Sequence, residues 1–146
     1  MAEKNTNYLS YIANMDSSEI LPGVMDRLQF LIDNHQPIAL GSASKNSIEI
    51  LNKVNLTNQF NAIIDGNAVT KAKPDPEVFL KAAEAIGIDP VNCIVFEDSV
   101  AGIQAANTAN MISIGIGNAS VLNEADVVFK DFTEISKEFL DELIKK

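Results

Sequence analysis

The sequence predicts an α/β fold in which helices cover both faces of a parallel sheet. Short apolar runs, such as those at 38–40 and 93–96, alternate along the chain with segments of helical periodicity. These runs are apolar throughout, as is typical of strands that are buried on both faces. Each run is followed by a helical segment, which favours a parallel sheet. With 146 residues, the chain has about the length of one domain.

Proline, serine and apolar spacing define the elements of the first half. Tyr8, Tyr11, Ile12 and Met15 recur at helical spacing and predict a first helix. Later helices begin at a proline or at a serine that can cap the first turn. The expected elements are a helix over 3–14, a helix from Pro22 that ends at Pro37, a strand at 38–40, a helix from Ser44 and a strand at 61–65.

Capping signals are clearer in the second half. Asp75-Pro76 opens a helix that Gly87 closes, and Ser99 can cap the next one. The expected elements are a helix from Asp75-Pro76 to Ile86, a strand at 93–96, a helix from Ser99, strands at 111–116 and 127–129, and a closing helix at 133–145.

Composition narrows the possible partners. The net charge is −9, which argues against nucleic acids and anionic membranes because both require clustered cations. Cys93 is the single cysteine, so an intrachain disulfide is excluded. We find neither a secretory leader nor an apolar run long enough for a membrane helix. We therefore expect a cytoplasmic location.

Polar residues after the first buried strand form a candidate phosphate site. Ligands of open parallel sheets bind at the carboxyl ends of the strands. Here Ser42, Ala43, Ser44, Lys45 and Asn46 join the strand at 38–40 to a helix. Backbone N–H groups at a helix N-terminus, two hydroxyls, an amide and an ammonium favour an anion. A serine-rich turn with a helix cap is the alternative interpretation.

Two further segments carry charges near strand ends. The prolines around Lys73 hold it in an extended approach to a helix, where it could neutralise a phosphoryl group; the alternative is a solvated loop lysine. Glu97 and Asp98 end the most apolar strand. Hard carboxylate oxygens suit Mg²⁺, and the alternative is an acidic turn before a helix N-terminus.

Together these segments resemble the haloacid dehalogenase superfamily of phosphotransferases. Ser42 matches the serine or threonine at a strand end, and Lys73-Pro74 matches the superfamily's lysine motif. The run from Glu97-Asp98 through Ile103 matches the acidic pair that precedes a helix of small residues. The resemblance implies a Rossmann-like three-layer core, Ser42 and Lys73 as catalytic residues, and Mg²⁺ on Glu97 and Asp98.

The segment Ser42-Ala43-Ser44-Lys45-Asn46 further resembles the β-phosphoglucomutases within this superfamily. There the equivalents of Ser44, Lys45 and Asn46 hold a second sugar phosphate. The implied reaction interconverts β-glucose 1-phosphate and glucose 6-phosphate through the 1,6-bisphosphate. A sugar-phosphate phosphatase is one alternative. Another is a fragment without enzymatic activity that binds phosphate or a partner chain.

The chain departs from this family at its N-terminus. Family members begin with a strand bearing Asp-x-Asp, whose first aspartate is the nucleophile, and this sequence contains no Asp-x-Asp. The resemblance implies that residues 1–20 are a remnant of a helical cap with its linker and that residues 21–146 form a partial core.

The family's central strand is then missing from the expected sheet. The strands that end near Ser42 and Asp98 would each expose an unpaired edge, which favours pairing with other chains unless the sheet closes over the gap. We therefore expect a truncated chain that binds Mg²⁺ weakly or not at all, lacks mutase turnover by itself, and self-associates or accepts an N-terminal fragment.

Overall fold

A six-stranded parallel sheet forms the centre of the molecule. The computed structural model describes residues 11–13, 24–41, 60–64 and 68–145. Five strand pairs, all parallel, join the sheet in the order β3-β2-β1-β4-β5-β6. The strands are β1 (Tyr11–Ala13), β2 (Ile38–Gly41), β3 (Ala62–Ile64), β4 (Ile94–Glu97), β5 (Ile112–Ile116) and β6 (Val127–Phe129).

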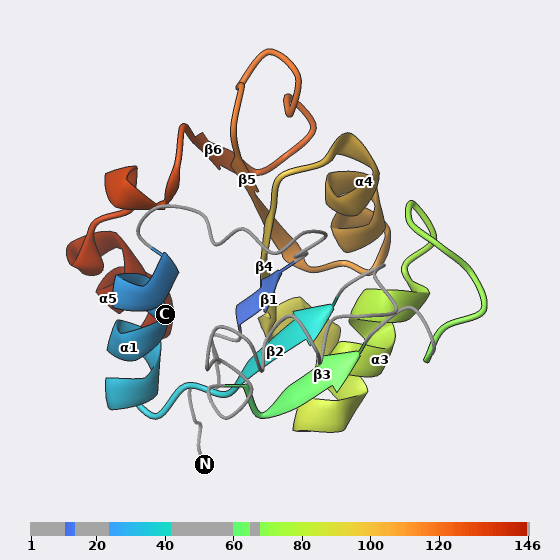
Figure 1. Cartoon of the computed structure of the whole chain (residues 1–146), viewed down its shortest axis with the longest axis horizontal. Helices are drawn as coiled ribbons and strands as arrows, with labels where there is room; N and C mark the ends of the chain where they lie inside the picture. The colour runs from blue at the N-terminus through green and yellow to red at the C-terminus, as the bar shows by residue number, and fades with distance from the viewer. Residues whose placement is uncertain (1–10, 14–23, 42–59, 65–67, 146) are drawn as a thin grey trace.

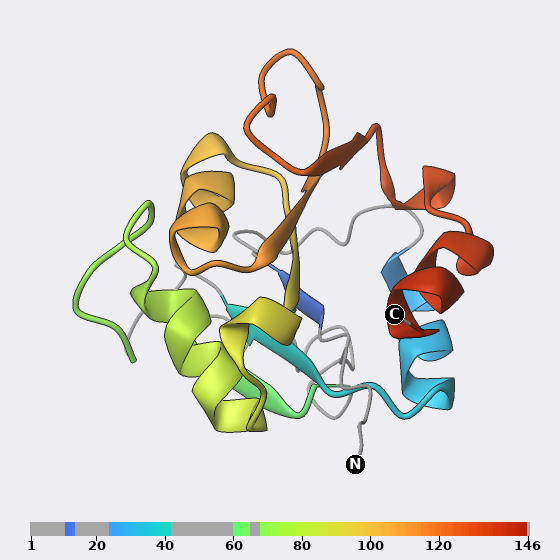
Figure 2. The same ribbon diagram turned by 180° about the vertical axis from the view of Figure 1, so that it is seen from behind.

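Helices lie on both faces of this sheet, so the predicted three-layer α/β fold is confirmed. Figures 1 and 2 show α1 and α5 together on one side of the strands and α3 and α4 on the other. The described helices are α1 (Val24–Asp33), α3 (Glu77–Ile86), α4 (Val100–Thr108) and α5 (Lys137–Lys145), with short 3₁₀ turns at Pro90–Asn92 and Phe132–Glu134.

Two apolar cores separate these layers. Side chains alternate along β2, so Ile38 and Leu40 enter one core while Ala39 enters the other. The first core includes Leu31 of α1 and Leu140 of α5. The second is built largely from alanines and other small side chains of α3 and α4. Burial on both faces explains why the strand sequences are apolar throughout.

Two of the predicted capping signals, Ser99 and Gly87, act as expected, whereas the N-cap of α3 is Pro76, without a side-chain capping hydrogen bond. The Ser99 hydroxyl accepts a hydrogen bond from the Gly102 N–H at 3.0 Å, and it begins α4. Gly87 ends α3 in the left-handed conformation, with φ of 73°, which glycine adopts without steric cost. The strands lie within one or two residues of their predicted bounds. The predicted closing helix is divided into a 3₁₀ turn and α5.

The N-terminal segment corrects two expectations. Residues 11–13 form β1 rather than part of a helix over 3–14. This strand pairs with β2 on one side and β4 on the other, so the central position of the sheet is filled by the chain itself. Pairing both edges satisfies backbone groups that would otherwise be unpaired within the sheet. The free energy gained from these backbone hydrogen bonds outweighs the local preference for a helix. Tyr and Ile are also good strand formers.

The helix predicted between Pro22 and Pro37 is confirmed as α1, and two other predictions about the N-terminal half are untested. The assignment of residues 1–20 to a cap with its linker stays a prediction, apart from residues 11–13, which form β1. The helix from Ser44 also stays a prediction, because it lies outside the described residues. Among the helices that the structure describes, none is long and apolar enough to cross a membrane.

Candidate functional site

Glu97 is a buried carboxylate at the carboxyl end of β4. It is the last residue of that strand, and its side chain has no exposed surface. Two charged or polar residues are fully buried in the described part of the chain, Glu97 and Ser113. Burying a carboxylate costs free energy unless a cation and hydrogen bonds compensate it. The surroundings of Glu97 supply both.

The N-terminus of α4 holds one oxygen of Glu97. Oε1 accepts hydrogen bonds from the backbone N–H of Asp98 at 2.9 Å and of Ser99 at 3.2 Å. The Ser99 hydroxyl also lies within hydrogen-bond distance of Oε1, at 3.2 Å. Backbone N–H groups at the start of a helix favour a negative charge. The turn between β4 and α4 therefore supplies the hydrogen-bond donors that hold this carboxylate.

Lys73 balances the charge of the other oxygen. Its Nζ lies 2.9 Å from Oε2 of Glu97, and the lysine side chain is 8% exposed. The two residues are far apart in sequence, and Lys73 belongs to the loop between β3 and α3. Adjacent carboxylates such as those of Glu97 and Asp98 repel each other, and the buried ammonium of Lys73 offsets this repulsion.

Phe79 connects Lys73 to the end of β2. The Lys73 Nζ lies 4.8 Å from the centroid of the Phe79 ring, a distance at which a cation is attracted by the ring face. The same ring packs so closely against Gly41 that a Cβ atom there would meet it at 3.3 Å. Gly41 ends β2 and directly precedes Ser42. One buried aromatic ring therefore contacts both the lysine and the strand end before the predicted phosphate loop.

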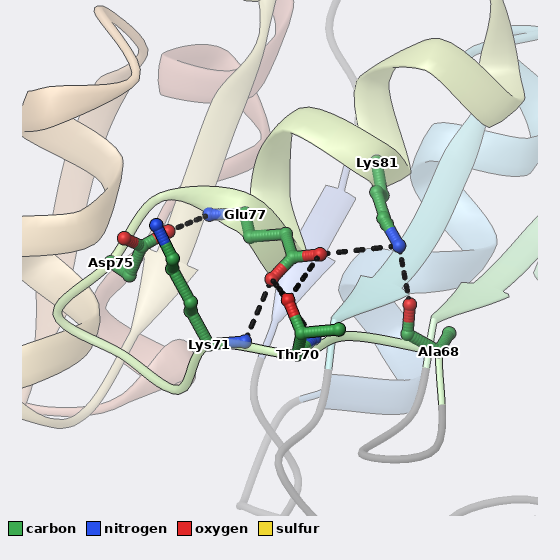
Figure 3. A network of polar contacts seen from close by, with 6 residues as sticks. All are labelled: Ala68, Thr70, Lys71, Asp75, Glu77 and Lys81. Atoms are coloured by element: carbon green, nitrogen blue, oxygen red, sulfur yellow. Dashed lines mark hydrogen bonds and ion pairs between the residues drawn. The ribbon is translucent and has the colours of Figure 1, made fainter.

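Glu77 fixes the loop that carries Lys73. Figure 3 shows its carboxylate facing Thr70, Lys71 and Lys81. Oε1 accepts hydrogen bonds from the N–H of Lys71 at 2.8 Å and of Thr70 at 3.0 Å, and Oε2 lies 3.2 Å from Nζ of Lys81. The Lys71 N–H is the largest of the influences that lower the pKa of Glu77 to about 2. Glu77 is therefore ionised at neutral pH.

Asp98 is the exposed member of the acidic pair. It follows the last residue of β4, and its side chain reaches solvent while that of Glu97 does not. A carboxylate at this position has the donor chemistry that Mg²⁺ prefers. Both oxygens of Glu97 already have protein partners, so Asp98 offers the more accessible ligand. Among the described residues, no group of three or more acidic, histidine or cysteine side chains could enclose a metal.

Metal ligation by Glu97 and Asp98 stays a prediction, as does the catalytic role of Lys73. The predicted phosphate residues Ser42, Ala43, Ser44, Lys45 and Asn46 lie outside the described residues. Two contributors were not predicted from the sequence. Phe79 and Glu77 both lie on α3, where a buried aromatic residue is an ordinary part of a core and an acidic residue is favourable in the first turn.

Comparisons with known proteins identify the chain's relatives. The family model described as haloacid dehalogenase-like hydrolase matches residues 2–110. A β-phosphoglucomutase of Bacillus subtilis is 34% identical over 142 residues, which cover 97% of this chain and 63% of that protein. Hexitol phosphatase B of Escherichia coli is 31% identical over 130 residues, which cover 83% of this chain and 58% of the relative.

Solved structures agree with these relatives. A crystal structure of β-phosphoglucomutase from Clostridium difficile has a TM-score of 0.82 and 38% sequence identity, covering 90% of this chain and 59% of that one. The chain thus spans 63% or less of the length of these three proteins. Because the family model matches well over half of the residues, the chain belongs to the haloacid dehalogenase-like hydrolases.

Proposed function

We propose that this chain contributes the phosphate-binding and charge-balancing half of a site for phosphoryl transfer on sugar phosphates. The observation that carries the proposal is the buried pair of Lys73 and Glu97 at the carboxyl end of β4, with Nζ and Oε2 at 2.9 Å. Catalysis of phosphoryl transfer depends mainly on positioning and on stabilising negative charge. A lysine fixed by a buried carboxylate and an aromatic ring suits that task.

Each site residue has a proposed role. Lys73 and Ser42 bind the oxygens of the transferred phosphoryl group, while Ser44, Lys45 and Asn46 hold the second phosphate of a bisphosphorylated sugar. Asp98, with Glu97 behind it, is the proposed site for Mg²⁺. When bound, the ion would offset charge on the phosphoryl oxygens. With two protein carboxylates, we expect weak Mg²⁺ binding by the chain alone.

The finer reaction is interconversion of β-glucose 1-phosphate and glucose 6-phosphate. Its support is the similarity to β-phosphoglucomutases in sequence and in structure. A sugar-phosphate phosphatase is the second candidate. It is favoured by similarity to hexitol phosphatase B and to a fructose-1-phosphate phosphatase, which is 35% identical over 104 residues. The predicted second phosphate clamp at Ser44, Lys45 and Asn46 favours the mutase.

Phosphoryl transfer of this kind also requires an aspartate that carries the phosphoryl group. None of the ten aspartates in the chain forms an Asp-x-Asp pair, and an aspartyl phosphate cannot form without a suitably placed aspartate. We therefore expect the isolated 146 residues to bind phosphate without mutase turnover. A suitably placed aspartate outside these 146 residues would have to supply that group. Apart from residues 11–13, which form β1, residues 1–20 are proposed as the remnant of a helical cap with its linker.

Phosphate titration monitored by NMR tests the proposal. Inorganic phosphate should shift the amide signals of residues 42–47 and the side-chain amino signal of Lys73. Lys45→Ala should raise the dissociation constant for phosphate by about tenfold or more, since a charged hydrogen bond contributes roughly 1.5–3 kcal/mol. Lys130→Ala, which removes an exposed lysine after β6, is the matched control and should leave the titration unchanged.

Two results would contradict it. If phosphate moves neither the loop signals nor that of Lys73, the segment is only a helix cap and the phosphate site is wrong. If the isolated chain converts β-glucose 1-phosphate in the presence of a trace of bisphosphate, and Asp98→Ala abolishes that turnover, then these residues include the phosphoryl acceptor and the proposed need for an aspartate outside them is wrong.

A further inference from the structure

We propose that Glu77 is a positioning residue for Lys73 and that it fixes the lysine for phosphate binding through the loop between β3 and α3. The inference rests on the proposed function, because it assumes that the Lys73 ammonium contacts a phosphoryl group. Glu77 itself does not contact Glu97 or the end of β4 in any of the hydrogen bonds and ion pairs of the described residues. It acts on the backbone around Lys73.

The Glu77 side chain holds the residues before the lysine. Its Oε1 binds the N–H of both Thr70 and Lys71, and the Thr70 hydroxyl lies at 3.1 Å. Lys81, which pairs with Oε2, also donates to the carbonyl of Ala68 at 2.6 Å. Figure 3 shows these groups converging from the loop and from α3. The carboxylate therefore ties the chain from Ala68 to Lys71 onto the first turns of the helix.

The Glu77 backbone holds Asp75, two residues after the lysine. Its N–H donates to Oδ1 of Asp75 at 3.0 Å. The Asp75 N–H in turn donates to the Ala72 carbonyl at 3.0 Å, which closes a turn around Lys73. Glu77 is thus linked to the loop on both sides of the lysine, through its carboxylate before Lys73 and through its N–H after it.

These hydrogen bonds on both sides of Lys73 matter because a lysine side chain is otherwise poorly ordered. A lysine side chain has four rotatable carbon bonds and loses about 2 kcal/mol of rotamer entropy when it is held in one geometry. Its Nζ must reach both the ring of Phe79 and Oε2 of Glu97. With the backbone fixed by Glu77, part of the ordering cost is met when the chain folds rather than when the anion binds.

NMR of the lysine amino groups tests the inference. The Nζ resonance of Lys73 is assigned by its loss in Lys73→Arg, and inorganic phosphate is the probe. In Glu77→Ala the Lys73 resonance should move towards those of exposed lysines such as Lys130. The dissociation constant for phosphate should rise by about three- to tenfold, the effect of roughly one lost hydrogen bond. Glu77→Gln keeps the shape and one acceptor oxygen, so its effect should be smaller and in the same direction.

Glu84→Gln is the matched control. Glu84 lies on the same helix and is exposed, so the Lys73 resonance and the phosphate affinity should both be unchanged. Backbone signals of β4 and β5 establish that each variant is folded, and if Glu77→Ala does not fold, Glu77→Gln decides the question.

The result that overturns the inference is specific. Folded Glu77 variants with an unchanged Lys73 resonance would show that Glu77 stabilises the loop without positioning the lysine. If phosphate leaves the Lys73 resonance of the wild-type chain unmoved, the inference fails with its premise, and if the signals of residues 42–47 are also unmoved, the proposed function fails. The two failures are therefore distinguishable.

Discussion

Gly102 provides the space that the carboxylate of Glu97 occupies. A Cβ atom on Gly102 would overlap the Glu97 side chain at Cγ, Cδ and Oε2. Gly102 is buried in the first turns of α4, where its own N–H donates to the Ser99 hydroxyl. The absence of a side chain at this single position therefore allows the buried acid to lie against the helix and meet Lys73.

Gly102→Ala should destabilise the chain although alanine is the better helix former. The gain in helix propensity is at most about 1 kcal/mol. Displacing Glu97 breaks a buried ion pair, which costs about 3–5 kcal/mol, so a net loss of about 2–4 kcal/mol is expected. Urea unfolding measures it. Gly87→Ala is the control. Nothing lies within 4 Å of a Cβ atom there, so its loss of stability should come from the strained backbone alone. Equal losses in the two variants would contradict the overlap argument.

The ion pair between Lys73 and Glu97 should show strong coupling in a double-mutant cycle. Lys73→Met leaves a buried carboxylate without its cation and should cost about 3–5 kcal/mol. Adding Glu97→Gln should recover part of that loss, because the neutral amide no longer needs a cation. Denaturant unfolding of the four proteins gives the coupling energy. Lys130→Met, at an exposed position, should change stability by less than about 0.5 kcal/mol. If the losses of stability in Lys73→Met and Glu97→Gln simply add in the double variant, the ion pair contributes nothing to the free energy of unfolding.

Ser113 ties together β5, α4 and the segment before β6. The buried hydroxyl lies 2.7 Å from Oδ1 of Asn107 and accepts from the Asp126 N–H at 3.1 Å. The Ser113 N–H donates to the Asp126 carboxylate at 2.8 Å. Ser113→Ala removes the hydroxyl from Asn107 Oδ1, Asp126 Oδ2 and the Asp126 N–H, and it should cost about 1–3 kcal/mol in urea unfolding. For comparison, Ser120→Ala removes an exposed hydroxyl and should be nearly neutral; a similar loss there would refute the importance of the buried network.

Acid should weaken the attachment of the Lys73 loop. The pKa of Glu77 is lowered in the folded chain from 4.5 to about 2, first by the Lys71 N–H and also by Lys81 and Thr70. A carboxylate with a lowered pKa stabilises the fold above its unfolded value of 4.5, and this contribution is lost as pH falls towards 2. The other charged groups drawn beside Glu77 at this loop are the carboxylate of Asp75 and the ammonium groups of Lys71 and Lys81.

Melting temperatures from pH 6 to pH 2 measure this loss in the wild type and in Glu77→Gln. The wild type should lose more stability over that range, since the variant lacks the titrating group. Asp131, whose pKa is also lowered, chiefly by Thr133, titrates in both proteins and cancels in the comparison. Parallel profiles would exclude a Glu77 contribution.

The backbone of β1 should be essential to the sheet. Ile12 is paired with Ala39 on one side and Val95 on the other. Proline cannot donate to a strand ladder and is not tolerated in central strands. Ile12→Pro should therefore cost at least about 1 kcal/mol for the lost hydrogen bond, and unpaired edges should promote self-association, measured by light scattering. Val127→Pro alters the first residue of the edge strand β6 and should be milder. A stable, monomeric Ile12→Pro variant would show that β1 is dispensable.

Sequence alone determined most of the architecture, for local physical reasons. Apolar runs such as 38–40 and 93–96 are strands because they are too short for helices and must be buried on both faces. Ser99 and Gly87 mark helix ends because their chemistry satisfies terminal backbone groups. The charged residues at strand ends were identified for a similar reason, since parallel topology brings the carboxyl ends of strands together.

Only the tertiary structure decided how these residues are used. Tyr11, Ile12 and Ala13 have helical spacing with their neighbours, yet they form the central strand because both neighbouring strands need a hydrogen-bonding partner. The sequence places Lys73 and Glu97 far apart, and their pairing depends on packing between a loop and a strand end. Gly102 and Glu77 matter because of what lies next to them in space, which no local pattern contains.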